Sequence, residues 1–308
     1  MIKFPLVLLS LVALPSAAFA QLAVAPAEFV MRFQPPDGVK VKMSYRLERT
    51  RLVEGQPQVK DVGETRTEGV FKRVGAGFEY APRTVSSTMN RNGNLLNDPI
   101  VALMSKVPVT FVISAGGEAT SIKGYGEVEA LLKSTVSPQV AAALAPIVNE
   151  AAMAGRETAE WNARYADWAD GEFAIGQVID VKAPQPLPNG ETLTYTIRTT
   201  IAGWEPCPAG QCVRLEQIYE SDAAALANIA NGVMQRVTAA TPAAAGLVVP
   251  SNKGARVSGS LTRLIDPKTM LIYSEQVRRI ISMNLQVAGK GLVPTTQEEV
   301  RTYAYVYE

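Results

Sequence analysis

The feature that most constrains the fold of this chain is a strict alternation of apolar and polar side chains along residues 39–48. Every second position is apolar, and the positions between are polar or charged. The apolar set is Val39, Val41, Met43, Tyr45 and Leu47, and the polar set is Lys40, Lys42, Ser44, Arg46 and Glu48. A period of two places these sets on opposite faces of a β-strand, so the segment predicts an antiparallel sheet with one dry and one wet face.

Alternation of this kind recurs along most of the chain. It predicts strands over residues 28–33, 65–74, 77–89, 107–113, 119–123, 173–182, 193–201, 213–219, 257–264, 270–287 and 300–307. Phe111 lies on the inward face of one of them, and Asn92-Gly93 favours a hairpin turn. Tyr273 lies on an apolar face that Glu275 and Arg279 interrupt. We expect one domain over residues 21–308, with about ten antiparallel strands.

One long block, residues 127–171, has helical rather than strand periodicity. Ser137-Pro138 predicts a helix start, and Gly155 and Gly171 predict helix ends. The aromatic side chains in the last helical run are Trp161, Tyr165 and Trp168, which are spaced to share one face. Such a face packs against the sheet as ordinary core, or it forms a lid whose rings line a ligand cavity.

A second helical insertion is predicted over residues 222–237, with Asp222 as its cap. Together the strands and helices predict an α+β fold. We expect one large curved antiparallel sheet, resembling a half-barrel, with helices covering one of its faces.

Residues 1–20 have the pattern of a secretory signal peptide. Lys3 precedes an apolar stretch, and Ala18-Phe19-Ala20 matches the cleavage pattern, so cleavage is expected after Ala20. An uncleaved membrane anchor is the alternative, although the apolar stretch is short for a bilayer span. The expected location is therefore the periplasm or the outside of the cell.

Composition excludes several classes of function. The chain holds 30 Lys and Arg against 29 Asp and Glu, which gives no electrostatic basis for binding nucleic acid or an anionic membrane surface. It contains no histidine, which removes the commonest general base and most ordinary zinc, copper and haem ligands. We expect no cofactor and no metal.

Cys207 and Cys212 flank a Pro/Gly turn and are the two cysteines of the chain. In an exported protein this spacing predicts a disulfide across the tip of a hairpin. Closing so short a loop stabilises the fold by roughly 2 kcal/mol. The alternative, a redox pair, requires closer cysteines at the start of a helix.

The layout of the chain resembles that of the periplasmic half-barrel proteins that carry lipids and lipoproteins. The resemblance covers roughly residues 28–308, and it includes the run from Phe111 to Gly124 that leads into a helix. The layout of the chain is also similar to that of uncharacterised secreted families of this size. The resemblance implies an apolar cavity under helical plugs, and no single residue's role is transferred by it.

Three functions are weighed. The first is a non-catalytic carrier of a hydrophobic, lipid-like molecule, with ligand-binding candidates Trp161, Tyr165, Trp168, Tyr45, Phe111 and Tyr273. The second is a cell-envelope interaction or assembly factor with a solid core, which docks a partner protein through an edge strand such as residues 39–47.

The third function is an enzyme that uses Glu160, Asp167 and Asp170 as acid and base near the tryptophans. On a helix these acids fall beside the aromatic stripe, and Arg164 lies one turn after Glu160, where the two can pair at the surface. This pattern is typical of a solvated face, so no enzymatic activity is expected.

Overall fold

The computed structural model describes residues 27–96, 107–135, 149–186, 192–222, 226, 249–287 and 291–308. The predicted signal peptide, the predicted helix start at Ser137-Pro138 and all but two residues of the helix predicted over 222–237 lie outside these ranges. No helix in the described ranges has the length and apolar character needed to cross a membrane.

Most of the described residues belong to strands. In the first half these are β1 (Glu28–Val30), β2 (Lys40–Val53), β3 (Val59–Val74), β4 (Gly77–Tyr80), β5 (Arg83–Arg91), β6 (Asn94–Leu95), β7 (Thr110–Ile113) and β8 (Ala119–Lys123). In the second half they are β9 (Glu172–Ala174), β10 (Val178–Pro186), β11 (Thr192–Cys207), β12 (Gly210–Ser221), β13 (Val249–Ile265), β14 (Ile272–Val287) and β15 (Gly291–Tyr307).

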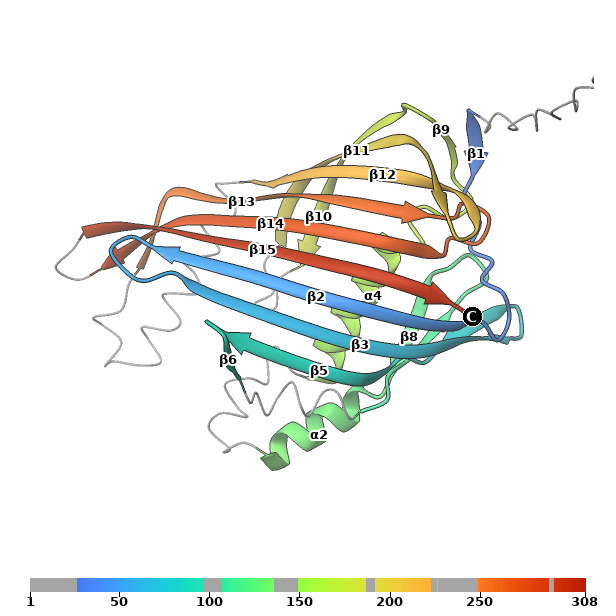
Figure 1. Ribbon diagram of the computed structural model, residues 1–308, viewed down its shortest axis with the longest axis horizontal. Coiled ribbons are helices and arrows are strands. Elements are labelled where there is room, and N and C mark those ends of the chain that lie inside the picture. Colours follow the sequence, from blue (N-terminus) through green and yellow to red (C-terminus); the bar gives the residue numbers. More distant parts are fainter. Residues whose placement is uncertain are drawn as a thin grey trace, which may run out of the picture.

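The described strands form one 13-stranded antiparallel sheet and a small pair, β1–β9. The sheet is curved and open (Figure 1), and its strand order is β10-β11-β12-β13-β14-β15-β2-β3-β4-β7-β8, with β5 paired to β3 and to β6. The predicted large antiparallel sheet is confirmed. Strand β2 lies between β15 and β3 in the middle of the sheet, so the docking edge suggested for residues 39–47 is wrong.

The predicted α+β class, with helices covering one face, is also wrong. Strands account for 64% and helices for only 12% of the described residues, which are therefore mainly β. The described helices are α2 (Tyr125–Thr135) and α4 (Glu150–Arg164). Of these, α4 lies behind one part of the sheet in Figure 1, and α2 packs against α4. The long strands are thus largely uncovered by these two helices.

The boundaries of α4 differ from the predicted ones for physical reasons. Asn149 caps the helix, since its side-chain Oδ1 accepts a hydrogen bond of 2.8 Å from the backbone N–H of Ala152. The helix runs through Gly155, where a glycine costs only about 1 kcal/mol relative to alanine, and it ends at Arg164 rather than Gly171. Trp168 therefore lies beyond the helix, in the turn that follows it.

Proline explains a second difference. Residues 77–89 were predicted as one strand, but β4 ends at Tyr80 and β5 begins at Arg83. Pro82 lies in the gap and has no N–H to donate to a sheet ladder, so the chain leaves one pairing and enters another. β4 then pairs with β7, whereas β5 pairs with β3.

The predicted disulfide is confirmed. Cys207 and Cys212 are bonded at the tip of the β11–β12 hairpin, with their Cα atoms 5.8 Å apart. A structural disulfide fits a protein that is exported to an oxidising compartment.

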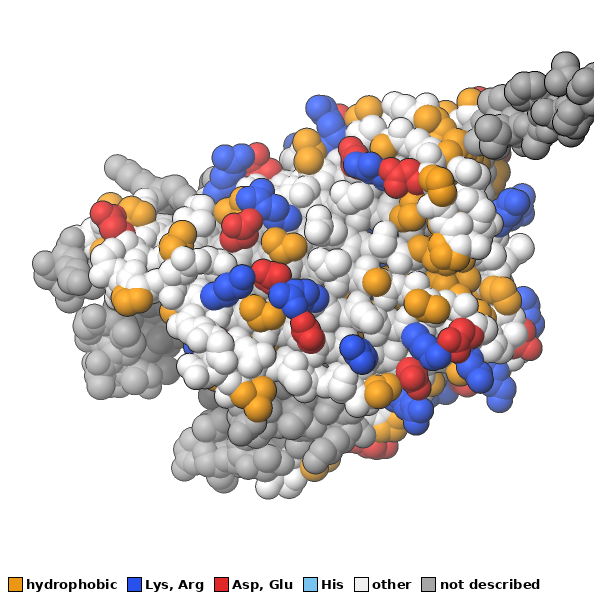
Figure 2. Space-filling model, viewed as in Figure 1, with side chains coloured by type: hydrophobic (Ala, Val, Ile, Leu, Met, Phe, Trp, Pro, Cys, Tyr) orange, Lys and Arg blue, Asp and Glu red, His pale blue; other side chains and the backbone are white. Residues whose placement is uncertain are grey.

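The two faces of the long strands differ in side-chain type. We call the face that bears the odd-numbered residues of β2, β14 and β15 the inner face, because α4 packs against it. The opposite, outer face is the one seen in Figure 2, where basic and acidic side chains are interspersed. The ion pairs on it are exposed, such as Arg278–Glu298 at 2.7 Å and Lys42–Glu308 at 2.6 Å. Each of these two pairs matches one base to one acid, and Arg46 and Lys60 pair with Glu48 and Glu64 in a group of two bases and two acids.

The main core lies where α4 meets one end of the inner face. Phe33 is buried there and makes edge contacts with Phe71, Phe78, Trp161 and Tyr165, with ring centroids 5.5–6.4 Å apart. Such edge-to-face pairs are each worth about 0.5–1.5 kcal/mol beyond the burial of their area. Through these aromatic side chains the core joins the segment that follows β1 to the sheet and to α4.

Candidate functional site

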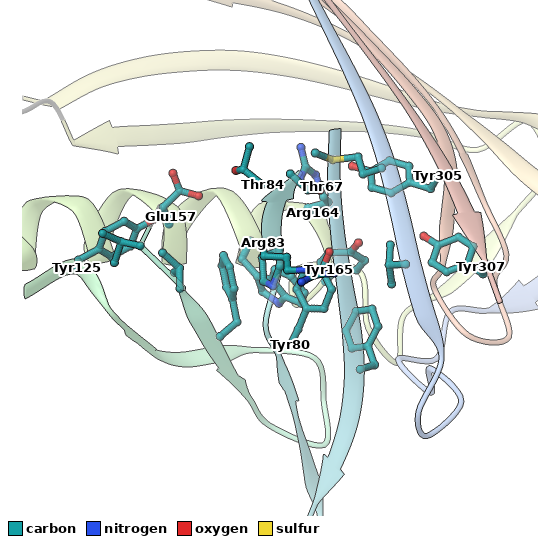
Figure 3. Close-up of a pocket in the computed structure, with 18 residues that line it drawn as sticks. Thr67, Tyr80, Arg83, Thr84, Tyr125, Glu157, Arg164, Tyr165, Tyr305 and Tyr307 are labelled. Atoms are coloured by element: carbon teal, nitrogen blue, oxygen red, sulfur yellow. The ribbon is translucent and has the colours of Figure 1, made fainter. Parts of the chain in front are cut away.

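A pocket of about 260 Å³ lies between α4 and the inner face of β2, β3 and β15 (Figure 3). Its walls are mostly apolar and aromatic, and it opens partly to solvent. The lining residues are Val41, Met43, Thr67, Phe71, Tyr80, Pro82, Arg83, Thr84, Val107, Val109, Phe111, Tyr125, Glu157, Trp161, Arg164, Tyr165, Tyr305 and Tyr307. A concave, mostly apolar site with a few polar groups is the usual form of a small-molecule pocket.

Trp161 forms the centre of the aromatic wall. Its ring centroid lies 4.5 Å from that of Tyr165 and 4.9 Å from that of Phe111. The indole Nε1–H donates a hydrogen bond of 2.9 Å to the backbone carbonyl of Gly117. Because this buried N–H is satisfied by the backbone, the ring is held in one orientation and presents its apolar surface to the pocket.

Tyrosines supply most of the other rings. Tyr80, Tyr125, Tyr165, Tyr305 and Tyr307 all line the pocket, which accounts for five of the ten tyrosines in the chain. Burial raises the pKa of each of the five above its ordinary value. They are therefore uncharged at physiological pH. The hydroxyl of Tyr307 donates a hydrogen bond of 2.7 Å to the carbonyl of Ile272.

Arg164 brings a positive charge into this aromatic pocket. Its Nη2 donates to Oε1 of Glu275 at 2.7 Å, while Arg263 donates to Oε2 of the same carboxylate at 2.6 Å. Arg263 also donates to the backbone carbonyl of Arg164 at 3.1 Å. The Glu275 side chain is 1% exposed, whereas 27% of the Arg164 side chain is exposed. The carboxylate is thus enclosed, and the guanidinium remains accessible from the pocket.

The shared carboxylate stays ionised. Burial acts to raise the pKa of Glu275, but the guanidinium groups of Arg263 and Arg164 outweigh burial and hold that pKa below its ordinary value. The predicted surface pair of Arg164 with Glu160 is therefore wrong, because Arg164 reaches Glu275 on β14 instead. The two positive charges share one negative charge, so the group as a whole is cationic.

The carboxylate that does line the pocket is that of Glu157, on α4 (Figure 3). Burial is the main cause that raises its pKa, and the neighbouring Glu160 adds to the shift. Burial acts to raise the pKa of both Glu157 and Glu275, but the net shifts are opposite, because only Glu275 is hydrogen-bonded to arginines that outweigh burial. Within the described residues, no three Asp, Glu, His or Cys side chains are grouped so as to hold a metal ion.

The predicted ligand-binding residues divide into two groups. Trp161, Tyr165 and Phe111 line the pocket. The other three are absent from its walls.

Each of those three packs elsewhere. Trp168 packs against Phe173 with 5.6 Å between ring centroids, and its Nε1 donates to Ala163 O at 3.1 Å. Tyr45 lies 4.9 Å from Tyr303 across the β2–β15 pairing, and Tyr273 lies 5.2 Å from Tyr307. Tyr45 and Tyr303 are nevertheless on the inner face, next to the pocket along the strands.

Sequence reasoning missed the charged groups of the site. None of Glu160, Asp167 and Asp170 lines the pocket, while Arg164 and Glu157 do. The available signal was the presence of Glu275 on an otherwise apolar strand face. A buried carboxylate requires a cationic partner, and that partner is supplied by a helix more than a hundred residues away, Arg164 being 111 positions from Glu275.

Comparison with known proteins assigns no family. No family model matches the chain, and no curated protein matches its sequence. A solved structure that describes lipid–protein interactions in lipovitellin matches with 9% identity and a TM-score of 0.41 over 89% of this chain and 25% of its own. This chain therefore spans about a quarter of that protein's length.

Two further structures are similar at a lower level. DynF from the dynemicin biosynthesis pathway of Micromonospora chersina matches with 9% identity and a TM-score of 0.20, over 92% of this chain and 86% of its own. OccK2 (OpdF) of Pseudomonas aeruginosa matches with 9% identity and a TM-score of 0.20, over 88% and 100%. Likenesses at these TM-scores assign neither a fold family nor a ligand.

Proposed function

We propose that this protein is an exported, non-catalytic binding or carrier protein for a hydrophobic, lipid-like molecule, acting in the periplasm. The observation that carries the proposal is the aromatic pocket between α4 and the inner face of the sheet. Trp161, Tyr165 and Phe111 give it a rigid apolar wall. The disulfide supports export.

The volume of the pocket limits the size of the ligand that it can hold. Its volume of about 260 Å³ is slightly below the roughly 300 Å³ at which typical small-molecule sites begin. It therefore accommodates one ring system or part of an acyl chain rather than a whole phospholipid. The aromatic wall and the uncharged tyrosines favour apolar groups, and Arg164 and Glu157 are the polar groups beside them.

The test combines native mass spectrometry, organic extraction of the purified protein and titration with a fluorescent fatty-acid probe. We expect co-purified lipid and saturable binding of the probe. An empty protein that does not bind the probe would contradict the proposal. If such a protein were cross-linked in cells to a stoichiometric protein partner, the envelope-factor hypothesis would replace it.

A pair of variants on β5 localises the binding. Thr84→Phe introduces a ring at a position that lines the pocket, whereas Val85→Phe does so at the next position, which is 56% exposed and outside it. We expect the Thr84 variant to lose most probe binding and the Val85 variant to keep it, with unfolding curves checking that both fold. Equal binding by the two variants would place the ligand elsewhere.

A further inference from the structure

A group of arginines lies on the inner face beyond the pocket, at the middle of the long strands. We call Arg49, Arg279 and Arg301, together with Glu299, the arginine cluster. Glu299 accepts hydrogen bonds from all three guanidinium groups, at 2.9 Å from Arg49, 3.3 Å from Arg279 and 2.7 Å from Arg301. The residues come from three adjacent strands, β2, β14 and β15.

The arginine cluster carries unbalanced positive charge. Three guanidinium groups remain charged at every physiological pH, and they face a single carboxylate. Burial acts to raise the pKa of Glu299, but Arg301, Arg279 and Arg49 outweigh it and lower that pKa, so the carboxylate is ionised. The net charge is therefore two positive units. The adjacent acid on β3, Asp61, is bonded to Arg91 at 2.7 Å.

The geometry leaves these arginines able to bind a second anion. Glu299 is 2% exposed, but between 31% and 37% of each of the three arginine side chains is exposed. The Nε of Arg279 is buried and has no hydrogen-bond partner within the described residues. Guanidinium groups bind carboxylates and phosphates through paired N–H donors. The exposed parts of the three arginine side chains can therefore meet an anion, while the buried carboxylate of Glu299 holds the arginines in place.

The arginine cluster and the pocket share one continuous surface. On β15 the pocket residues Tyr307 and Tyr305 are followed on the same face by Tyr303, Arg301 and Glu299. From Tyr305 to Arg301 is four residues, or roughly 13–14 Å along an antiparallel strand.

The surface between them is amphipathic. Tyr303 packs against Tyr45 with 4.9 Å between ring centroids, and the guanidinium carbon of Arg164 lies 5.5 Å from the Tyr303 centroid. Aromatic rings therefore connect the apolar pocket to the cationic cluster.

We infer that the arginine cluster binds the anionic group, a carboxylate or phosphate, of an amphiphilic ligand whose apolar part lies in the aromatic pocket. The inference rests on the proposed function and specifies its ligand class. The juxtaposition supports it because an anion between the exposed guanidinium groups offsets their mutual repulsion. The distance along β15 lets a single molecule occupy both places.

The test measures binding of a medium-chain fatty acid, its methyl ester and a lysophosphatidic acid to the full-length protein at neutral pH by isothermal titration calorimetry. We expect both acids to bind at least about tenfold more tightly than the ester, because hydrogen bonds to charged groups are among the strongest. Equal affinity of acid and ester would overturn the inference and leave the proposed function standing. Failure of all three to bind would remove the proposed function itself.

Variants then assign the discrimination to the arginine cluster. Arg279→Met is expected to remove most of the preference for the acids, while Arg279→Lys, which keeps the charge, retains part of it. Arg278→Met is the matched control, because Arg278 is the next residue and pairs with Glu298 on the outer face. Preference that persists unchanged in Arg279→Met and in Arg301→Gln would overturn the assignment.

Inorganic phosphate distinguishes a headgroup from a free anion. We expect phosphate to weaken binding of the fatty acid and to leave binding of the ester unchanged. Phosphate that binds the wild-type protein under conditions where no amphiphile does would identify a site for free anions and overturn the inference.

Discussion

The inner and outer faces of the long strands carry charge in different ways. On the outer face, Arg278 pairs with Glu298 and both side chains are about half exposed, at 51% and 43%. On the inner face, Glu275 and Glu299 are 1% and 2% exposed and are shared by two and three arginines respectively. The Arg278–Glu298 pair is balanced, whereas the two inner groups have an excess of positive charge.

This difference indicates that the two faces meet different physical requirements. Exposed pairs contribute little to stability, typically below about 1 kcal/mol, and mainly keep the surface soluble. Buried carboxylates lose hydration that only well-placed guanidinium groups replace. An excess of arginine on the inner face goes beyond what Glu275 and Glu299 need. The proposed binding of an anionic ligand on the same face would account for this excess.

The largest expected effect comes from removing a buried carboxylate. Glu275→Gln leaves Arg164 and Arg263 without their anionic partner, so we expect the free energy of unfolding to fall by about 3–5 kcal/mol. Glu298→Gln on the outer face is the control and should lower it by less than about 1 kcal/mol. Urea unfolding measures both. Similar losses in the two variants would show that the faces do not differ energetically.

Acid unfolding tests the same difference at the arginine cluster. The pKa of Glu299 is lowered in the folded protein from its ordinary value of 4.5. The stabilisation that this lowered pKa gives the folded protein is fully present above pH 4.5, and it is lost as the pH falls through the pKa of Glu299 in the folded protein. We expect Glu299→Gln to be less stable than the wild type by about 2 kcal/mol at neutral pH. The difference should shrink as the pH falls below 4.5, as followed by urea unfolding at successive pH values. A difference that stays constant with pH would mean that the charge of Glu299 contributes nothing.

Alkaline titration addresses the aromatic surface between the pocket and the arginine cluster. Burial is the largest cause that raises the pKa of Tyr45, from 10.0 to about 12. A raised pKa contributes stability below pH 10 that is lost as pH rises through the folded pKa. Since Tyr45 is partly exposed, we expect the wild type to lose only about 1 kcal/mol more than Tyr45→Phe between pH 10 and 12. Equal losses would show that the phenol is solvated like a free tyrosine.

The alternation of side chains was enough to predict the sheet, because a period of two has one simple structural solution. Tyr45, Tyr273 and Phe111 all lie on strands on the expected side. The prediction overestimated the helix content, since part of the predicted helical block is a turn after Arg164. It underestimated the length of strands that extend beyond their apolar stretches. Strand β13, for example, begins at Val249, eight residues before the predicted start at Val257.

The site was only partly predictable. Trp161 and Tyr165 were identified because their spacing shows one helical face, which is local information. The ion pair between Arg164 and Glu275 depends on how α4 packs across the sheet, and no local sequence pattern predicts that packing. The arginine cluster is likewise invisible along the sequence, because Arg49 and Glu299 are 250 residues apart. Strand register alone brings them together.

The pairing of β2 with β15 has a consequence for biosynthesis. Lys42 and Glu308, which bond across this pair, are 266 residues apart, so β2 leaves the ribosome long before its partner exists. Until then it presents an unpaired strand edge, which is a template for aggregation. Contacts of such separation also slow folding. We therefore expect the pairing of β2 with β15 to form late in folding. A chaperone that holds the N-terminal half of the chain until then is expected to raise the yield of native protein.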